Sequence, residues 1–233
     1  MTERVPLVLL PGFLDTETLW RHQVENLADI ADITIGDLTT QESIVEMASF
    51  TLARAPERFA LAGLSMGGYT AFEIMRQEPE RVTRLALLDT TPFGDPPERI
   101  AGRKNQLAMV RKGRFDEAVA ATVVLKMQPE GPPKPELAEM IRTMCMTIGP
   151  EILLRQQTAM LNRAGTSDVL ARIKCPTLVL CGRQDQPTPP EVHEEIAAGI
   201  DNATLVVIED CGHLAPLEQS QATTAAMREW LLE

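Results

Sequence analysis

The sequence predicts an α/β fold: a mostly parallel sheet of about six strands with helices on both faces, and a helical lid insertion. Short apolar runs typical of buried strands alternate with helical patterns along the chain, as parallel strands require. The alternation stops near residue 92, where prolines cluster, and resumes after residue 165. We therefore expect a first core segment at 1–91, a helical lid at 92–165, and a second core segment at 166–233.

The individual elements follow from the periodicity of apolar residues. Apolar runs mark six strands, at 5–10, 33–38, 59–62, 85–88, 177–181 and 204–208. Helical spacing marks the segments between and after them, at 19–27, 44–55, 69–77, 191–198 and 219–232. In the insertion we expect helices and proline-rich turns at 129–135, with no strand.

Composition limits the function classes. Hydrophobic residues make up 44% and charged residues 24%, as in ordinary globular proteins, and the formal net charge is −11. That charge argues against nucleic acid and anionic membranes as partners. The four cysteines form no CxxC pair, so we expect no metal site and no redox pair, and nothing in the sequence implies a cofactor. Without an apolar leader or a membrane-length apolar run, cytoplasmic location is the default expectation.

One motif suggests chemistry. The segment Gly63-Leu64-Ser65-Met66-Gly67 matches G-x-S-x-G and lies between a predicted strand and a predicted helix. This is the context of a nucleophile elbow, a sharp turn that exposes a serine at the edge of the sheet. The N-terminus of the following helix favours negative charge that develops there. The alternative interpretation is a tight turn with a helix-capping serine.

A serine hydroxyl needs a general base, and the chain contains three histidines. His213 directly follows the last predicted strand, at the sheet edge where catalytic groups of α/β folds gather. His22 and His193 lie in predicted helices, and we expect both on the solvated helix surface. The alternative for His213 is a loop residue that caps the last helix.

The base in turn needs a carboxylate that fixes its tautomer. Asp185 follows the predicted strand 177–181, and the order Ser65, Asp185, His213 is the chain order expected for this type of triad. Asp89, which ends the fourth predicted strand, is the alternative acid. Asp210 is too close to His213 in sequence and is expected in a turn.

An oxyanion hole requires two backbone N–H groups. The residue after the nucleophile, Met66, supplies one. The loop after the first strand supplies the other, and there Pro11 has no N–H, while Gly12 permits the turn. Phe13 is therefore the expected second donor, although its ring can equally serve simple packing.

These motifs, with Pro79-Glu80-Arg81-Val82 and Gly182-Arg183-Gln184-Asp185, resemble the α/β-hydrolase superfamily. The branch most similar in shape contains small carboxylesterases, enol-lactonases and C–C-bond hydrolases. The resemblance covers nearly the whole chain outside the insertion. It implies the triad Ser65, Asp185 and His213, but it does not define the substrate.

The insertion carries two compositional features that bear on the substrate. It holds eleven Lys and Arg residues but eight Asp and Glu residues, so its charge is +3 while the rest of the chain carries −14. A basic run comprises Arg99, Arg103, Lys104, Arg111, Lys112 and Arg114. An acidic carrier protein or a carboxylate-bearing substrate would explain this run, and so would a solvated helix face. Six methionines suit varied acyl chains or plain packing: Met109, Met127, Met140, Met144, Met146 and Met160.

The sequence therefore predicts a serine esterase that cleaves a small carboxylic ester or lactone through an acyl-enzyme. A C–C-bond hydrolase with the same triad is the enzymatic alternative. A ligand receptor or scaffold on the same fold is the alternative from another class, although a pure binder would not need the triad.

Overall fold

The computed structural model describes residues 4–127 and 134–233. Its sheet has six strands in the order β2-β1-β3-β4-β5-β6, and every neighbouring pair is parallel. The strands are β1 (Val5–Leu10), β2 (Ala31–Ile35), β3 (Phe59–Leu64), β4 (Val82–Leu88), β5 (Thr177–Gly182) and β6 (Ala203–Ile208). The expected fold class, with its parallel sheet, is confirmed.

The burial of the strands explains their sequence patterns. All residues of β3 and β5, in the middle of the sheet, are buried, so both strands are continuous apolar runs. The edge strand β2 alternates buried or half-buried with exposed residues. It ends at Ile35, earlier than expected, because the chain leaves the sheet after the Gly36 N–H donates to Leu9 O (2.9 Å).

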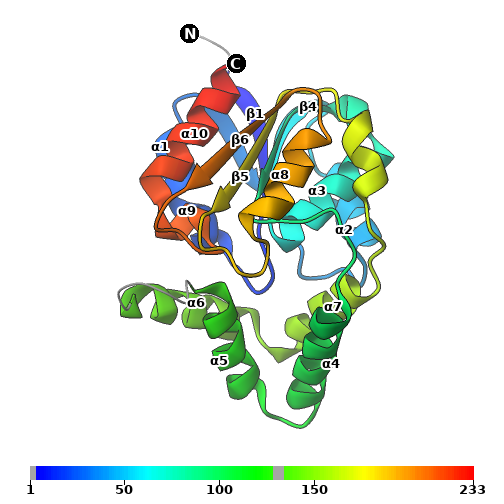
Figure 1. Cartoon of the computed structure of the whole chain (residues 1–233), viewed down its shortest axis with the longest axis vertical. Coiled ribbons are helices and arrows are strands. Elements are labelled where there is room, and N and C mark those ends of the chain that lie inside the picture. The colour runs from blue at the N-terminus through cyan, green and yellow to red at the C-terminus, as the bar shows by residue number, and fades with distance from the viewer. Residues whose placement is uncertain (1–3, 128–133) are drawn as a thin grey trace.

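Helices cover both faces of the sheet (Figure 1). On one face lie α1 (Arg21–Leu27), α9 (Ala215–Glu218) and α10 (Ser220–Leu232). On the other lie α2 (Ile44–Leu52), α3 (Met66–Gln77) and α8 (Pro190–Ala198). Short 3-10 turns are η1 (Glu17–Trp20), η2 (Pro79–Arg81) and η3 (Ser167–Arg172). Within the described ranges, no helix combines the length and the apolar character needed to cross a membrane.

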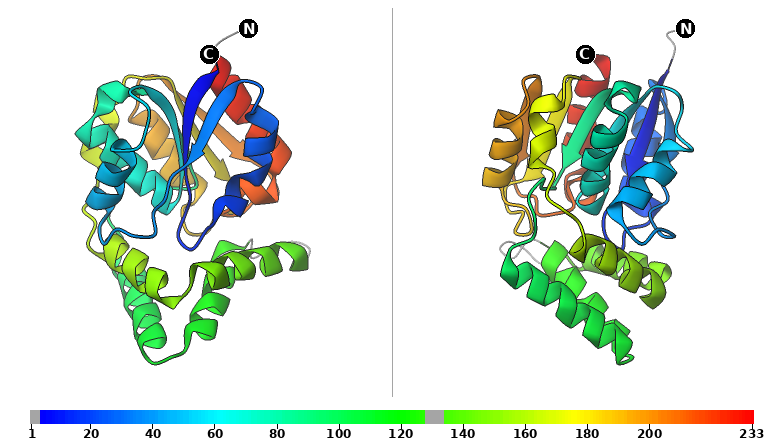
Figure 2. Two further views of the ribbon diagram at one scale, coloured as in Figure 1. Left: turned by 180° about the vertical axis from the view of Figure 1, so that it is seen from behind. Right: turned by 90° about the vertical axis from the view of Figure 1, so that its right-hand side faces the viewer.

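In its described residues, the insertion after β4 forms four helices: α4 (Pro97–Arg111), α5 (Phe115–Lys126), α6 (Pro135–Ile148) and α7 (Pro150–Leu161). They lie together beyond the carboxyl ends of the strands (Figures 1 and 2). The chain enters and leaves this region at one place, where the Thr166 N–H donates to Pro92 O (2.7 Å). Of the proline-rich turn expected at 129–135, residues 128–133 lie outside the described part.

Candidate active site

Ser65 lies in the sharp turn between β3 and α3, at the edge of the sheet that faces the insertion. Its backbone has φ 52° and ψ −109°, and a strained conformation of this kind costs about 1–3 kcal/mol. Two hydrogen bonds from the neighbouring strand end hold the turn. The Ser65 N–H donates to Leu88 O (3.0 Å), and Thr90 Oγ1 donates to Ser65 O (2.8 Å). The end of β4 therefore stabilises the strained turn.

The glycines around Ser65 are required because other backbone passes very close. A Cβ atom on Gly67 would lie 2.3 Å from Leu10 O, and one on Gly63 would lie 2.4 Å from Gly67 O. Backbone atoms of central strands and of the first helical turn cannot easily move away. The two glycines of the motif therefore reflect a steric requirement of the turn.

The structure brings Ser65, His213 and Asp185 together from three different loops. His213 Nε2 lies 3.0 Å from Ser65 Oγ, and its Nδ1 lies 2.9 and 3.0 Å from the two carboxylate oxygens of Asp185. His213 and Asp185 are both buried. These contacts require that His213 Nδ1 carries the proton, so that Nε2 can accept the proton of the serine hydroxyl.

Asp185 remains a carboxylate despite its burial. Burial alone would raise its pKa, but the charge of His213 and hydrogen bonds from His213 and Thr188 outweigh it and hold the pKa of Asp185 below its usual value. Thr188 contributes twice: its N–H donates to Asp185 Oδ1 (3.1 Å) and its hydroxyl to Oδ2 (2.6 Å). The threonine therefore fixes the orientation of the carboxylate toward the imidazole.

Asp89, the alternative acid, occupies a different position. It is fully buried, has φ 44°, and makes no hydrogen bond to His213 in the described part of the chain. Its Oδ1 accepts from the Gly182 N–H (3.0 Å) and its Oδ2 from the Ala215 N–H (3.2 Å). Burial, and then the nearby charge of Asp185, raise the pKa of Asp89. Asp89 thus connects the segments that carry the acid and the histidine.

Of the two expected oxyanion donors, Met66 directly follows the serine and Phe13 lies in the loop after β1. Met66 is the first residue of α3, where an N–H has no acceptor one turn earlier. The Phe13 N–H donates to no residue in the described ranges, and Phe13 lines the same cavity as Ser65. The phenyl ring is also part of the core, as the packing interpretation expected. Both N–H groups are therefore available to bind an oxygen atom.

A cavity of about 500 Å³ lies between the Ser65–His213 pair and helices α4, α5 and α7 of the insertion. This volume suits a small organic molecule. Its apolar lining includes Phe13, Tyr69, Met109, Ala121, Leu125 and Met160. Two of the six insertion methionines, Met109 and Met160, thus face the cavity.

The basic run of the insertion is not one continuous surface. Arg99 and Arg103 line the cavity, but Arg103 is paired with the buried Asp95 (2.5 Å). Arg99 has no carboxylate partner within the described ranges, and its guanidinium donates to Pro187 O, beside the acid loop. The other members of the run are exposed and lie outside the cavity lining: Lys104, Arg111, Lys112 and Arg114.

The expectation that His193 lies on the helix surface is wrong. His193 is fully buried, and its Nε2 accepts from the Thr90 N–H (3.0 Å), so Nδ1 carries the proton and faces Pro189 O (3.3 Å). The surface expectation also fails for His22, which is half-buried and lies 2.8 Å from Thr224 Oγ1. The glutamates around His193 in the sequence suggested a solvated face, but the packing of α8 against β5 and β6, with the hydrogen bond from Thr90, decides its environment.

This burial predicts a pH effect on stability. Burial lowers the pKa of His193 to about 4, below the usual value of about 6.5. Because the unfolded chain binds the proton more readily, the stability present above pH 6.5 is lost as the pH falls toward 4. We expect His193 to account for a loss of about 2 kcal/mol between pH 7 and pH 5. Urea unfolding at both values should show this loss in the wild type and a smaller loss in His193→Gln, which keeps an acceptor for Thr90. Equal losses in the wild type and in His193→Gln would show that His193 is not the source of the effect.

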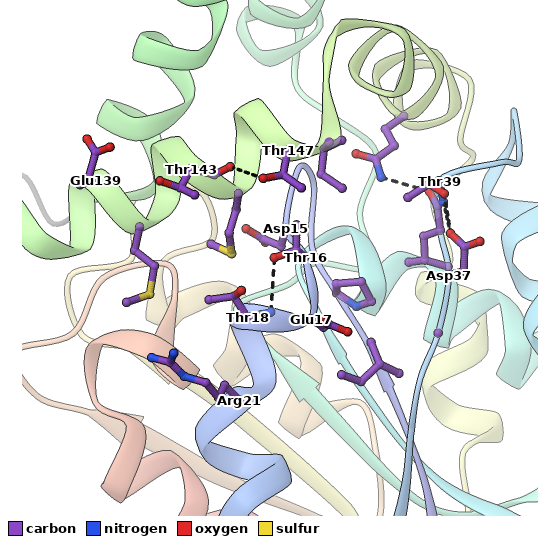
Figure 3. A pocket seen from close by; sticks show the side chains of 18 of the residues that line it. Asp15, Thr16, Glu17, Thr18, Arg21, Asp37, Thr39, Glu139, Thr143 and Thr147 are labelled. Atoms are coloured by element: carbon purple, nitrogen blue, oxygen red, sulfur yellow. Dashed lines mark hydrogen bonds between the residues drawn. The ribbon is translucent and has the colours of Figure 1, made fainter.

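A larger groove, of about 1050 Å³, lies on the other side of the loop after β1. Figure 3 shows it between α6 and the segment from Asp15 to Thr18, with threonine and acidic side chains around it. Neither Ser65 nor His213 lines this groove. This groove, although larger than the cavity at Ser65, is therefore not the place where the serine and histidine meet.

The sequence profile of the alpha/beta hydrolase family matches residues 7–226, nearly the whole chain. The chain belongs to this family. The match includes Ser65, Asp185 and His213, and the expected resemblance is confirmed.

Three relatives give the family membership more detail. A pimeloyl-[acyl-carrier protein] methyl ester esterase of Nitrosomonas europaea is 26% identical over 89% of this chain and 88% of that protein. A 2-hydroxy-6-oxo-6-phenylhexa-2,4-dienoate hydrolase of Comamonas testosteroni is 29% identical over 70% of this chain and 59% of that protein. A solved structure of a thermophilic esterase from Thermogutta terrifontis, with malate bound, is 31% identical. It has a TM-score of 0.88 and matches 98% of this chain and 89% of that one.

Proposed function

We propose that this α/β hydrolase is a serine esterase that cleaves a small carboxylic ester or lactone through an acyl-enzyme. The family and the esterases among its relatives confirm the predicted class, a hydrolase of ester bonds. The observation that carries the proposed mechanism is the 3.0 Å contact between Ser65 Oγ and His213 Nε2 at the wall of the cavity beneath the insertion.

The geometry supports a role for each group. Ser65 Oγ attacks the carbonyl carbon while His213 Nε2 takes the hydroxyl proton, and Asp185 stabilises the imidazolium that forms. The carbonyl oxygen becomes an oxyanion that accepts hydrogen bonds from the N–H groups of Phe13 and Met66. His213 then gives the proton to the departing alcohol, which leaves an ester on Ser65. Water hydrolyses this ester by the same proton route.

We assign the segment 92–165 the role of a lid. Its helices provide much of the cavity wall opposite Ser65, including Met109 and Leu125. A lid excludes water from the reacting carbonyl and strengthens the electrostatic interactions there. Cleavage of a C–C bond is the second candidate activity, because one relative is the dienoate hydrolase described above.

A chemical probe and a substrate panel test this proposal. The wild type should react with a fluorophosphonate probe at Ser65 and should hydrolyse members of a panel of short esters, lactones and thioesters. A receptor or scaffold would neither react with the probe nor hydrolyse any member of the panel. Turnover of a β-dicarbonyl compound without ester turnover would favour the C–C hydrolase.

We further propose that Arg99 binds an anionic group of the substrate, such as a carboxylate. The cavity lining also contains Glu98, but Arg99 is its one cation without a carboxylate partner in the described ranges. A related esterase is known with malate, a dicarboxylate, bound. An acidic carrier protein, suggested by the name of another relative, would instead contact the exposed members of the basic run.

Paired substrates test the role of Arg99. With a carboxylate-bearing ester, Arg99→Gln should lower kcat/KM about tenfold, the value of one charge-assisted hydrogen bond, and it should spare a neutral ester of equal length. Lys104→Gln, on the same helix but outside the cavity, is the matched control and should change neither. Added salt should reduce the preference of the wild type, since salt screens the attraction between charges beyond a Debye length, which is about 8 Å at physiological ionic strength. If both esters respond alike to Arg99→Gln, the assignment to Arg99 is wrong.

A further inference from the structure

The loop that carries Phe13 is held by two side chains of the insertion. Lys126 Nζ, from α5, donates to Phe13 O (2.5 Å), and the Leu14 N–H donates to Gln156 Oε1, from α7 (3.0 Å). Phe13 O and Leu14 N–H belong to the same peptide unit. The insertion therefore holds both polar ends of one peptide in the oxyanion loop.

This peptide is the central one of a tight turn. The Asp15 N–H donates to Gly12 O (3.3 Å), which closes a four-residue turn with Phe13 and Leu14 in the middle. Leu14 has φ 56°, at the third position of the turn, where such values favour glycine. A leucine there is strained, and without outside contacts the central peptide would relax by rotating. The two hydrogen bonds from the insertion oppose that rotation.

The two side chains that make these contacts are buried. Lys126 is 4% exposed and Gln156 is 2% exposed. The ammonium of Lys126 also pairs with Asp15 Oδ1 (2.6 Å), at the end of the same turn, and Gln156 Nε2 donates to Leu38 O (3.0 Å). Each side chain thus has defined partners in the core, and water cannot readily replace either one.

We propose that Lys126 and Gln156 are positioning residues of the reaction: they hold the turn so that the Phe13 N–H points at the developing oxyanion. The proposal rests on the serine esterase function given above. On this proposal the insertion does more than cover the cavity, because docking of α5 and α7 completes the oxyanion hole. The insertion and the chemical step are then coupled through the Phe13–Leu14 peptide, which adjoins the Gly12–Phe13 peptide that carries the donor N–H.

Two variants remove these contacts separately. Gln156→Met keeps the size of the side chain but removes the acceptor for Leu14. The double variant Lys126→Met with Asp15→Asn removes the bond to Phe13 without leaving a buried charge unpaired. Loss of an entire oxyanion donor costs about a hundredfold to a thousandfold in kcat, so misplacement of one should cost about tenfold to a hundredfold. KM should stay within about threefold of the wild-type value, because binding of the ground-state carbonyl depends less on the oxyanion hole than the transition state does.

A trifluoromethyl ketone inhibitor separates positioning from folding. Addition of Ser65 Oγ to the ketone carbon forms a tetrahedral adduct whose oxyanion lies in the hole, while the serine proton passes to His213. In both variants the inhibition constant should rise by the factor by which kcat falls. Arg155→Met is the matched control, because Arg155 neighbours Gln156 on α7 and donates to Thr39 O (2.6 Å), outside the oxyanion loop. It should change kcat less than twofold.

Several outcomes would overturn the inference. Unchanged kcat and inhibition constant in both variants would do so, and so would an equal loss in Arg155→Met. If Gln156→Met does not fold, as judged by circular dichroism, the double variant carries the test. If neither folds, the contacts are structural and the positioning role is wrong. A wild type without Ser65-dependent turnover would instead refute the proposed function.

Discussion

Replacement of Ser65 by alanine should lower kcat by about four to six orders of magnitude while the protein remains folded. The hydroxyl is the atom that bonds to the substrate in the proposed mechanism, and in the described structure its hydrogen-bond partner is His213. Removal of Oγ leaves the backbone bonds to Leu88 and Thr90 intact. The strained turn should therefore survive, and the residual rate should reflect the oxyanion hole and substrate binding alone.

The measurement combines turnover with labelling. Ester hydrolysis and fluorophosphonate labelling should both disappear in Ser65→Ala. Ser49→Ala is the control, because Ser49 is an exposed residue of α2 outside the lining of the Ser65 cavity. Its Oγ donates to Val45 O on the same helix. Its activity and labelling should match the wild type. More than a few per cent of wild-type activity in Ser65→Ala would show that another group is the nucleophile.

Replacement of Asp185 by asparagine should lower kcat by about ten thousandfold at neutral pH. The amide of asparagine can turn its NH₂ toward His213 Nδ1, because Thr188 still donates to its oxygen. That arrangement favours the tautomer with the proton on Nε2, which cannot accept the proton of Ser65. Thermal unfolding should change little, since the side chain keeps its size and its bond to Thr188.

Replacement of Asp89 by asparagine should instead reduce stability and have little effect on kcat. One of the two N–H groups that Asp89 accepts, from Gly182 or Ala215, would face an NH₂ group and remain unpaired. We expect a loss of about 1–3 kcal/mol in the free energy of unfolding and less than about a tenfold loss in kcat. Steady-state kinetics and urea unfolding of both variants provide the comparison. A larger kcat loss for Asp89→Asn than for Asp185→Asn would make Asp89 the triad acid.

The sequence by itself determined the sheet, the turn around Ser65 and the candidates for base and acid. These features are local: apolar runs report burial in central strands, and Gly63 and Gly67 report a turn in which no Cβ fits. The chain order of Ser65, Asp185 and His213 then followed from their places after successive strands. Local patterns were enough to place these residues on their elements, although the steric requirement at Gly67 comes from Leu10 O, which is distant in the chain.

The tertiary structure alone decided which of the similar residues meet. Asp89 and Asp185 both follow strands, yet Asp185 turns toward His213 while Asp89 binds backbone N–H groups. His193 was expected on the helix surface and Arg103 in a basic run, but packing places Thr90 beside the histidine and Asp95 beside the arginine. No sequence pattern identified Lys126 and Gln156 as positioning residues, because the peptide they hold lies 113 and 142 residues away from them in the chain. Contacts at such separations depend on how the insertion docks on the core, and no local pattern encodes that geometry.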